Sequence, residues 1–224
     1  TTNYAYLSLV KKHLLRHKIK KYKIILEPFK KNTAPAILSS ALLNEIPHEQ
    51  PMIFFSSDNL IEEINKFNKA IYFYKKYLTS KNIFIFGIKP TSPSSEYGYF
   101  LTKKTLRKLD KVIKFIEKPN KSEVKEVLKK KGYMNSGMFF GTKESIISNF
   151  IKHQNKIFNL CNLAVGKSKI NKNIYHLNEK PFKKIKEISF DYAILEKSKN
   201  IYGIKLDILL NDLGNWKEIW KFFK

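Results

Sequence analysis

Residues 24–40 read IILEPFKKNTAPAILSS, an apolar and β-branched run that ends at Glu27-Pro28 and gives way, after two lysines, to small and apolar residues. The first part predicts a short buried strand, and the second predicts a helix with Asn32 and Thr33 as N-terminal capping candidates. A helix that begins where a strand ends presents unpaired N–H groups and the positive end of its dipole at that edge. Such a helix start suits a nucleotide phosphate, and plain capping is the alternative.

Strand-like and helical patterns alternate along the rest of the chain. Helical spacing marks residues 7–15, 34–46, 61–74, 121–132, 144–152 and 189–197, and extended runs occupy residues 51–59, 82–90, 97–102, 112–117, 133–141 and 201–206. This alternation predicts an α/β fold with a doubly wound, mostly parallel central sheet flanked by helices, in a single domain over residues 1–224. Ligands of such sheets bind outside the carboxyl ends of the strands. The candidates are therefore the polar residues that end strands: Glu27, Asp58, Glu117 and the group around Asp212.

The formal net charge of +24 invites a polyanionic partner. However, Arg16 and Arg107 are the only arginines in the sequence, and arginine is the side chain best suited to reading bases through two hydrogen bonds. The lysines are spread through nearly every segment, which favours a solvated surface. Nucleic-acid binding is therefore a third-ranked hypothesis.

Cys161 is the only cysteine, so the sequence allows no intrachain disulfide and no paired-cysteine metal motif. No apolar stretch approaches the roughly 18 residues that a spanning helix needs, and no signal-peptide pattern is present. A cytoplasmic protein without a membrane partner is expected. Because the chain starts with Thr1-Thr2 instead of methionine, we also expect that an N-terminal portion is missing.

Two carboxylates stand at strand ends in distant segments. Asp58 follows the run PMIFFSS, and Asp212 follows an apolar pair in LLNDLGNW. Two carboxylates that meet beside phosphate oxygens commonly hold Mg²⁺. A turn or capping role for either aspartate is an equal alternative.

Two further motifs place polar groups in extended segments. Glu117 and Lys118 precede Pro119, which disfavours a helical backbone there. The lysine could neutralise a sugar phosphate and the glutamate could accept hydrogen bonds from sugar hydroxyls, although a surface ion pair is the default. Asn135 and Ser136 interrupt a hydrophobic run and need partners, either a ligand or neighbouring backbone.

Several segments occur in a characteristic order: ILEPFKKNTAPA, SSDN, FGIKPTSPSSEYGYF, FIEKPN, GYMNSGMFFG, SFDYAILEK and NDLGNWKEIW. Together they resemble the bacterial mannose-1-phosphate guanylyltransferases, from about residue 20 to the end of the chain. The resemblance implies a Rossmann-like nucleotide-diphospho-sugar transferase fold. It also implies an enzyme that makes GDP-mannose and pyrophosphate from GTP and mannose 1-phosphate with Mg²⁺.

The resemblance implies roles for individual residues. Asp58 and Asp212 would bind the metal and, with Lys118, act in catalysis. The nucleoside would lie beside Asn32, Thr33 and Ala34. The sugar-phosphate pocket would contain Gly98, Glu117, Lys118, Asn135 and Asp191.

The sequence also departs from the family pattern. Asn59 replaces a histidine, Met134 replaces a tryptophan, and Leu209-Leu210 replaces a Gly-Trp pair. The family's N-terminal strand, Gly-rich loop with its arginine, and Pro-Lys pair, which bind the triphosphate, have no counterpart in these residues. We therefore expect a guanylyltransferase that is nearly inactive unless a separate chain or an upstream segment supplies the loop. The alternative is a non-catalytic relic or subunit that binds sugar phosphate or nucleotide.

Overall fold

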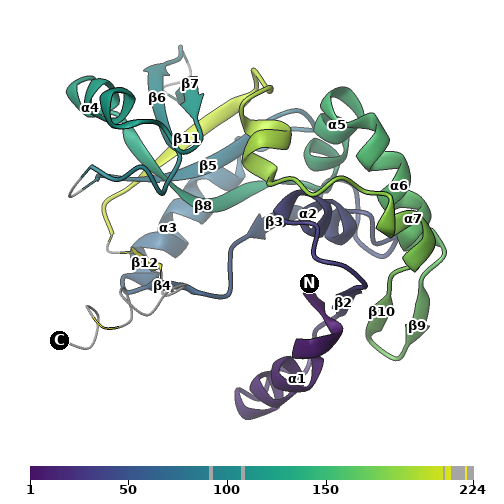
Figure 1. The fold of residues 1–224 in the computed structure, drawn as a ribbon. Helices are drawn as coiled ribbons and strands as arrows, with labels where there is room; N and C mark the ends of the chain where they lie inside the picture. Colours follow the sequence, from purple (N-terminus) through teal and green to yellow (C-terminus); the bar gives the residue numbers. More distant parts are fainter. Residues whose placement is uncertain (91–92, 107–108, 209, 213–219, 221–224) are drawn as a thin grey trace. The chain divides into compact units, whose positions relative to one another are not determined.

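The computed structural model describes residues 1–90, 93–106, 109–208, 210–212 and 220. The chain divides into two compact units: residues 1–47 with 146–194 form unit 1, and residues 48–145 with 195–224 form unit 2. Figure 1 labels the helices and strands. The expectation of a single domain over residues 1–224 stays a prediction.

Unit 1 contains a four-stranded sheet built around the opening stretch. Its strands, in order, are β1 (Thr2–Asn3), β2 (Ile24–Glu27), β10 (Ile174–His176) and β9 (Lys169–Asn171). Strand β2 is parallel to both β1 and β10, whereas β9 is antiparallel to β10. Ile24, Ile25 and Leu26 are buried, which confirms the predicted strand.

Helices complete unit 1. Helix α1 packs Leu7, Val10 and Leu14 against the buried cluster of Ile24, Leu26 and Ile174, as its apolar spacing predicts. Helices α6 and α7 and the β9–β10 hairpin were not predicted from the sequence. The helical elements are η1 (Tyr4–Tyr6), α1 (Leu7–Arg16), α2 (Thr33–Ala41), α5 (Lys143–His153), which begins in unit 2, α6 (Asn155–Gly166), α7 (Glu179–Lys183) and the π-helical turn η2 (Asp191–Leu195).

Unit 2 contains a six-stranded sheet and a two-stranded sheet. The larger sheet has the order β3 (Pro51–Phe54), β8 (Tyr133–Thr142), β5 (Ile83–Ile88), β11 (Ile201–Leu206), β7 (Asp110–Ile116) and β6 (Tyr99–Lys104). The smaller sheet pairs β4 (Asn59–Ile61) with β12 (Leu210–Asp212). Helix α3 (Ile64–Lys75) begins later than predicted, because residues 59–61 form β4 instead.

The α/β class is confirmed, but the expectation of a mostly parallel sheet is wrong for the described strands. Parallel pairing occurs for β1–β2, β2–β10 and β5–β11, and the other pairings are antiparallel. A parallel connection needs a crossover of about a dozen residues or more. Strand β7 starts at Asp110, too soon after β6 ends at Lys104 for such a crossover.

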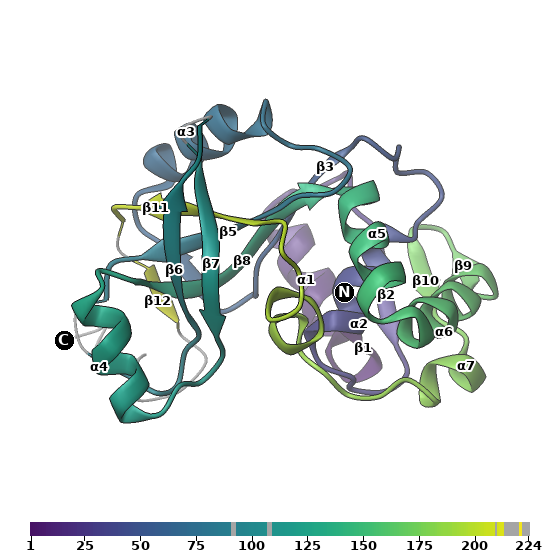
Figure 2. The ribbon, with the colours of Figure 1, turned by 90° about the horizontal axis from the view of Figure 1, so that it is seen from above.

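Phe100 fills the inside of a closed set of strands in unit 2. Besides the pairings along the sheet, β6 also pairs with β8, so that β5, β11, β7, β6 and β8 form a ring. The ring of Phe100, which is 1% exposed, packs so closely on Gly87 and Gly203 that a side chain at either glycine would collide with it. Figure 2 shows β6 and β7 side by side, with α4 (Lys121–Lys129) on the β6 side of the pair.

The core of unit 2 is aromatic on the α3 side. Phe67 of α3 lies against Phe86 of β5, with ring centroids 5.3 Å apart, and Tyr74 lies against Phe84 at 5.5 Å. Met138, Phe140 and Ile204 belong to the same buried cluster. Among the described helices, none has the length and apolar composition that crossing a bilayer requires.

Asp110 is a buried carboxylate, 4% exposed, that joins three strands. It accepts hydrogen bonds from Lys104 of β6 at 2.8 Å and from Lys205 of β11 at 2.6 Å. Thr102 donates a further hydrogen bond at 3.3 Å. Burial alone raises the pKa of Asp110, but the two ammonium groups outweigh it and hold the pKa below its usual range.

We predict that Asp110→Ala lowers the free energy of unfolding by about 2–3 kcal/mol, since the buried carboxylate loses three hydrogen bonds, two of them from lysine ammonium groups. The control is Glu126→Ala, which breaks an exposed pair with Lys130 and should lower the free energy of unfolding far less. Urea denaturation of the two variants measures both values. Equal losses would contradict a structural role for the Asp110 network.

Candidate functional site

Three of the predicted sugar-phosphate residues meet where β6, β7 and β8 lie side by side in unit 2. Tyr99 of β6 pairs with Ile116 of β7 and with Met134 of β8, so the next positions along these strands are Gly98, Glu117 and Asn135. The N–H of Asn135 donates to the carbonyl of Gly98 at 2.8 Å. A side chain at position 98 would collide with Oε2 of Glu117, so glycine lets this carboxylate lie against the backbone. We call this group the strand-end corner.

Lys118 extends from this corner into solvent. Its φ of +46° is in the left-handed region, which is uncommon for a residue with a side chain. The turn is held on its far side by Asn120, which forms a capping box with Glu123 at the start of α4. In the part of the chain that the structure describes, the Lys118 ammonium makes no ion pair and no hydrogen bond. The surface ion pair expected by default is therefore not found there.

Glu196 is a residue of the corner that sequence reasoning missed. Its Oε1 accepts a hydrogen bond from the N–H of Glu117 at 3.4 Å. Glu196 lies in SFDYAILEK, one of the segments that carry the family resemblance. Its position in that segment is the sequence feature that could have identified it. Its carboxylate adds a second negative charge beside the backbone of Glu117.

Asn135 and Ser136 lie in a bulge of β8. Between the pairs Ile85–Phe139 and Gly87–Asn135, β8 advances four residues while β5 advances two. The N–H of Gly137, whose φ is +73°, donates to Oδ1 of Asn135 at 3.4 Å, and Met138 donates to Ser136 Oγ at 3.3 Å. Neighbouring backbone thus supplies partners for both polar side chains.

The acidic pair lies next to this bulge. Asp58 is in the turn between β3 and β4, and Oδ1 of its carboxylate is buried without a hydrogen-bond partner among the residues that the structure describes. Strand β4 pairs antiparallel with β12, with Asp212 opposite Asn59. The Asn59 side chain donates to the carbonyl of Ser136 at 3.4 Å. The backbone of unit 2 therefore places position 58, one residue before β4, close to position 212 on the paired strand β12, beside the strand-end corner.

The residues present fit a divalent cation. A buried carboxylate oxygen without a donor, such as Oδ1 of Asp58, is the kind of ligand that Mg²⁺ or Ca²⁺ uses. Within the described ranges, no group of three or more His, Cys, Asp or Glu side chains could hold a metal by itself. A cation at Asp58 would therefore need further ligands from the substrate. The side chain of Asp212, Leu209 and residues 213–219 of NDLGNWKEIW lie outside what is described.

The predicted nucleoside residues lie in unit 1, at the start of α2. The N–H of Thr33 donates to Oδ1 of Asn32 at 2.8 Å, and the N–H of Ala34 donates to the carbonyl of Ile188 at 3.2 Å. Pro35 has no N–H, so the expectation of unpaired N–H groups at these positions is wrong: the Asn32 cap accounts for Thr33, and the carbonyl of Ile188 accounts for Ala34. The physical reason is that residues 188–190 pair with this helix start.

Asp191 also belongs to unit 1, at the beginning of η2. The preceding residue, Phe190, donates its N–H to Oγ1 of Thr33 at 2.8 Å. The structure therefore associates Asp191 with the predicted nucleoside residues of unit 1. Gly98, Glu117, Lys118 and Asn135 belong to unit 2.

Glu27, the carboxylate that ends β2, has a pKa well above the ordinary value for a glutamate. Within the described ranges its Oε1 is buried without a hydrogen-bond partner, and burial raises the pKa of Glu27 to about 7. The carboxyl group is therefore partly protonated near neutral pH. The sequence marks Glu27 as a strand-end candidate but cannot show this burial.

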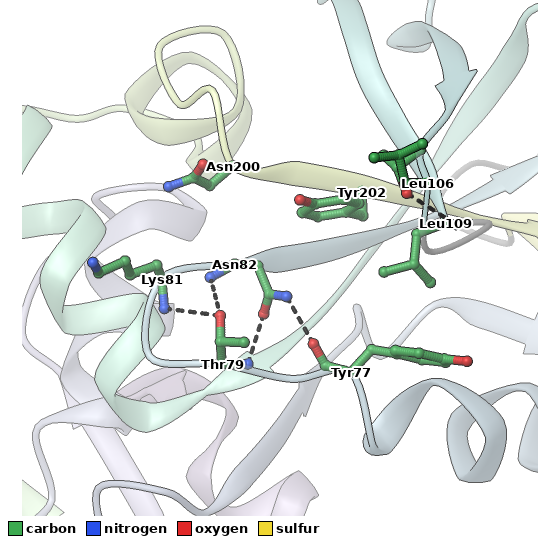
Figure 3. Close-up of a pocket in the computed structure, with 9 residues that line it drawn as sticks. Tyr77, Thr79, Lys81, Asn82, Leu106, Leu109, Asn200 and Tyr202 are labelled. Atoms are coloured by element: carbon green, nitrogen blue, oxygen red, sulfur yellow. Dashed lines mark hydrogen bonds between the residues drawn. The ribbon is translucent and has the colours of Figure 1, made fainter.

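A hollow of about 430 Å³ lies in unit 2 where β5 and β11 begin (Figure 3). At its floor, the Asn82 side chain accepts from the N–H of Thr79 at 2.9 Å and donates to the carbonyl of Tyr77 at 2.8 Å. The amide of Asn82 is thus used in closing the loop before β5. None of the predicted site residues lines this hollow.

Comparison with known proteins gives consistent matches. The model of the nucleotidyl transferase family matches residues 1–224. A mannose-1-phosphate guanylyltransferase of Escherichia coli is 33% identical over 210 residues, which are 90% of this chain and 45% of the relative. The alginate biosynthesis protein AlgA of Pseudomonas aeruginosa is 28% identical over 217 residues, 95% of this chain and 45% of the relative. The chain thus spans less than half the length of these curated relatives.

Two solved structures share the fold. A Helicobacter pylori protein described as a mannose-6-phosphate isomerase has a TM-score of 0.83 and 29% identity, covering 94% of this chain and 82% of that chain. A Thermus thermophilus protein described as a mannose-1-phosphate geranyltransferase has a TM-score of 0.79 and 20% identity, covering 96% and 62%. These likenesses confirm the predicted Rossmann-like fold, and the sequence matches confirm the predicted resemblance.

The raised pKa of Glu27 predicts a pH dependence of stability. The folded state binds this proton more tightly than the unfolded chain does. The protonated Glu27 carboxyl therefore stabilises the fold fully below pH 4.5, and this stabilisation is lost as pH rises through about 7. Relative to Glu27→Gln, the parent should lose about 3 kcal/mol of unfolding free energy across this interval. Chemical denaturation from pH 4 to 8 measures the difference.

Glu45→Gln is the matched control for this measurement. Hydrogen bonds from Lys23 and Tyr175 lower the pKa of Glu45 to about 2. Glu45 is therefore ionised in the folded protein throughout the measured range, and its titration changes the free energy of unfolding little above pH 4.5. Its curve should therefore run parallel to that of the parent. If the Glu27→Gln curve is also parallel to the parent, Glu27 does not titrate as described.

Proposed function

Since the chain belongs to the nucleotidyl transferase family, we propose that it is the nucleotidyl-transfer part of a mannose-1-phosphate guanylyltransferase. The reaction transfers GMP from GTP to mannose 1-phosphate and gives GDP-mannose and pyrophosphate. The observation that supports this most is the strand-end corner of Gly98, Glu117 and Asn135. Beside it lies Lys118, which has no partner among the described residues, and Asn59, which follows Asp58, donates to the carbonyl of Ser136 in the β8 bulge. The specific substrates rest on the 33% identical relative.

The chemistry requires charge and position more than proton transfer. The second pKa of a phosphate monoester is about 6, so mannose 1-phosphate is largely dianionic near neutral pH and needs no general base. Its oxygen attacks the α-phosphorus of GTP, and the bond to the β-phosphate breaks as pyrophosphate leaves. Lys118 would bind the attacking phosphate, and this alignment supplies much of the rate.

The other corner residues would orient the sugar. The Glu117 carboxylate can accept hydrogen bonds from sugar hydroxyls, and the Asn135 amide adds a polar group from the neighbouring strand. Gly98 leaves room for both because it carries no side chain. Glu196, which holds the N–H of Glu117, would fix the position of that residue.

Asp58 and Asp212 would hold Mg²⁺, which when bound supplies positive charge to the phosphates during transfer. Asp191 would bind the sugar phosphate, and Asn32, Thr33 and Ala34 would lie beside the nucleoside. Their N–H groups at positions 33 and 34 are already used, so they would contribute through side chains and shape instead of an anion site.

Location and pathway are part of the proposal. The only cysteine of the sequence, Cys161, is a buried free thiol, and a chain segment without disulfides suits the reducing cytoplasm that we propose as its location. The relative AlgA is named for alginate biosynthesis, which supports a role in bacterial polysaccharide synthesis.

The triphosphate would be bound by residues other than these 224, either in the same protein or on a separate chain. This follows from the family's Gly-rich loop, which has no counterpart in the sequence. A non-catalytic subunit that binds sugar phosphate or nucleotide is the second candidate, favoured by the same observation. Nucleic-acid binding ranks below both.

The test is a pyrophosphate-release assay with GTP, mannose 1-phosphate and Mg²⁺, using the chain with and without a Gly-rich N-terminal segment from a relative. We expect activity only with the segment, and a loss of about 100-fold or more for Lys118→Met. Lys121→Met is the control, because it removes an exposed lysine three positions away and should change the rate less than about twofold.

The outcomes separate the candidates. Binding of mannose 1-phosphate without turnover under any condition indicates the non-catalytic subunit. Equal losses for Lys118→Met and Lys121→Met would reject the role given to Lys118. Failure to bind either substrate would reject the function as a whole.

A further inference from the structure

A second pocket, of about 620 Å³, lies at the carboxyl ends of the parallel strands of unit 1. Its lining includes Tyr4, which follows β1, and His176, which ends β10, together with Lys167, Lys169, Asn178 and Lys180. The carboxyl ends of parallel strands are where α/β sheets bind ligands. The pocket contains none of the residues assigned above to the nucleoside, the sugar phosphate or the metal.

The pocket is built from groups held in place by hydrogen bonds. Because β2 lies between β1 and β10, the side chain of Tyr4 crosses the end of β2 to reach His176. The Tyr4 hydroxyl lies 3.1 Å from Nδ1 of His176, and the two rings are 5.6 Å apart. On the other side, the N–H of Asn178 donates to the carbonyl of Ala164 at 3.0 Å, and its Oδ1 accepts from the N–H of Lys180 at 3.2 Å.

The charge of the pocket is unbalanced. Lys169 stands opposite His176 in the β9–β10 pairing, and Lys167 and Lys180 contribute from the ends of α6 and α7. Over the described part of the chain, the ammonium groups of these three lysines have neither an ion pair nor a hydrogen bond. Glu179 is the one carboxylate among the lining residues. Cations that share a pocket repel one another unless an anion lies between them.

We propose that this pocket binds a small phosphate-bearing anion. Lysine ammonium groups bind phosphate as point charges, and the hydroxyl of Tyr4 and the amide of Asn178 offer orienting hydrogen bonds. The volume of about 620 Å³ is within the range of small-molecule sites. The proposal does not depend on the function proposed above, because it concerns different residues and requires no turnover.

The experiment titrates the chain with inorganic pyrophosphate at fixed ionic strength and follows the NMR signals of the His176 ring and Tyr4. Saturable shifts are expected. Lys169→Glu should weaken binding about tenfold or more, since one favourable charge becomes a repulsive one. The matched control is Lys172→Glu, the same charge change on the same hairpin at an exposed position that does not line the pocket.

The two variants decide between a site and diffuse attraction to a chain of net charge +24. A loss of less than about twofold for Lys172→Glu supports a site. Equal weakening by both variants, or shifts that do not saturate, overturns the proposal. If Lys169→Glu fails to fold, Lys180→Gln and Tyr4→Phe carry the same test, because each removes one polar contact without adding charge.

Separate titrations with mannose 1-phosphate and with GTP identify the source of the phosphate. Tighter binding of GTP than of mannose 1-phosphate assigns the pocket to a polyphosphate, and the reverse order assigns it to a monoester. These readings come from signals in unit 1 and need no Gly-rich segment. A failure of the transferase assay would therefore leave this result unaffected.

Discussion

The bulge in β8 is the constraint on which the unit 2 site depends. Strand β8 pairs with β3, β5 and β6, and the two residues by which it exceeds β5 between Phe139 and Asn135 cannot join the ladder. Gly137 accommodates the resulting turn with a positive φ, and the carbonyl of Ser136 becomes free to accept from Asn59. One irregularity of the backbone thus connects the strand-end corner with the turn that carries Asp58.

The charged groups of unit 2 fall into two kinds. Asp110 is buried and satisfied by Lys104 and Lys205, so its interactions stabilise the fold. In contrast, Oδ1 of Asp58 is buried without a donor, and Lys118 is exposed in a left-handed turn without a partner among the described residues. Leaving a buried polar atom unsatisfied costs about 1–3 kcal/mol. A bound ligand that supplied the missing partners of Asp58 and Lys118 would remove that cost.

The sequence predicts what depends on neighbours along the chain. The buried run at Ile24–Leu26, the cap at Asn32 and the position of Asp58 after an apolar strand all follow from local pattern. What it misses depends on distant partners. Strand β4 forms by pairing with the distant strand β12, and the N–H of Ala34 at the start of α2 donates to the distant carbonyl of Ile188. Local hydrophobicity likewise cannot distinguish the antiparallel return of β8 from a parallel strand.

The central claim is that a divalent cation binds between positions 58 and 212 beside the strand-end corner. Paramagnetic broadening tests it directly: Mn²⁺ is added to the isotopically labelled chain, and the loss of backbone amide signals is mapped. We expect Asn59, Ser136 and Asp212 to lose their signals first, and Asp58→Asn to remove this effect. Broadening confined to other carboxylates, or unchanged in Asp58→Asn, would contradict the claim.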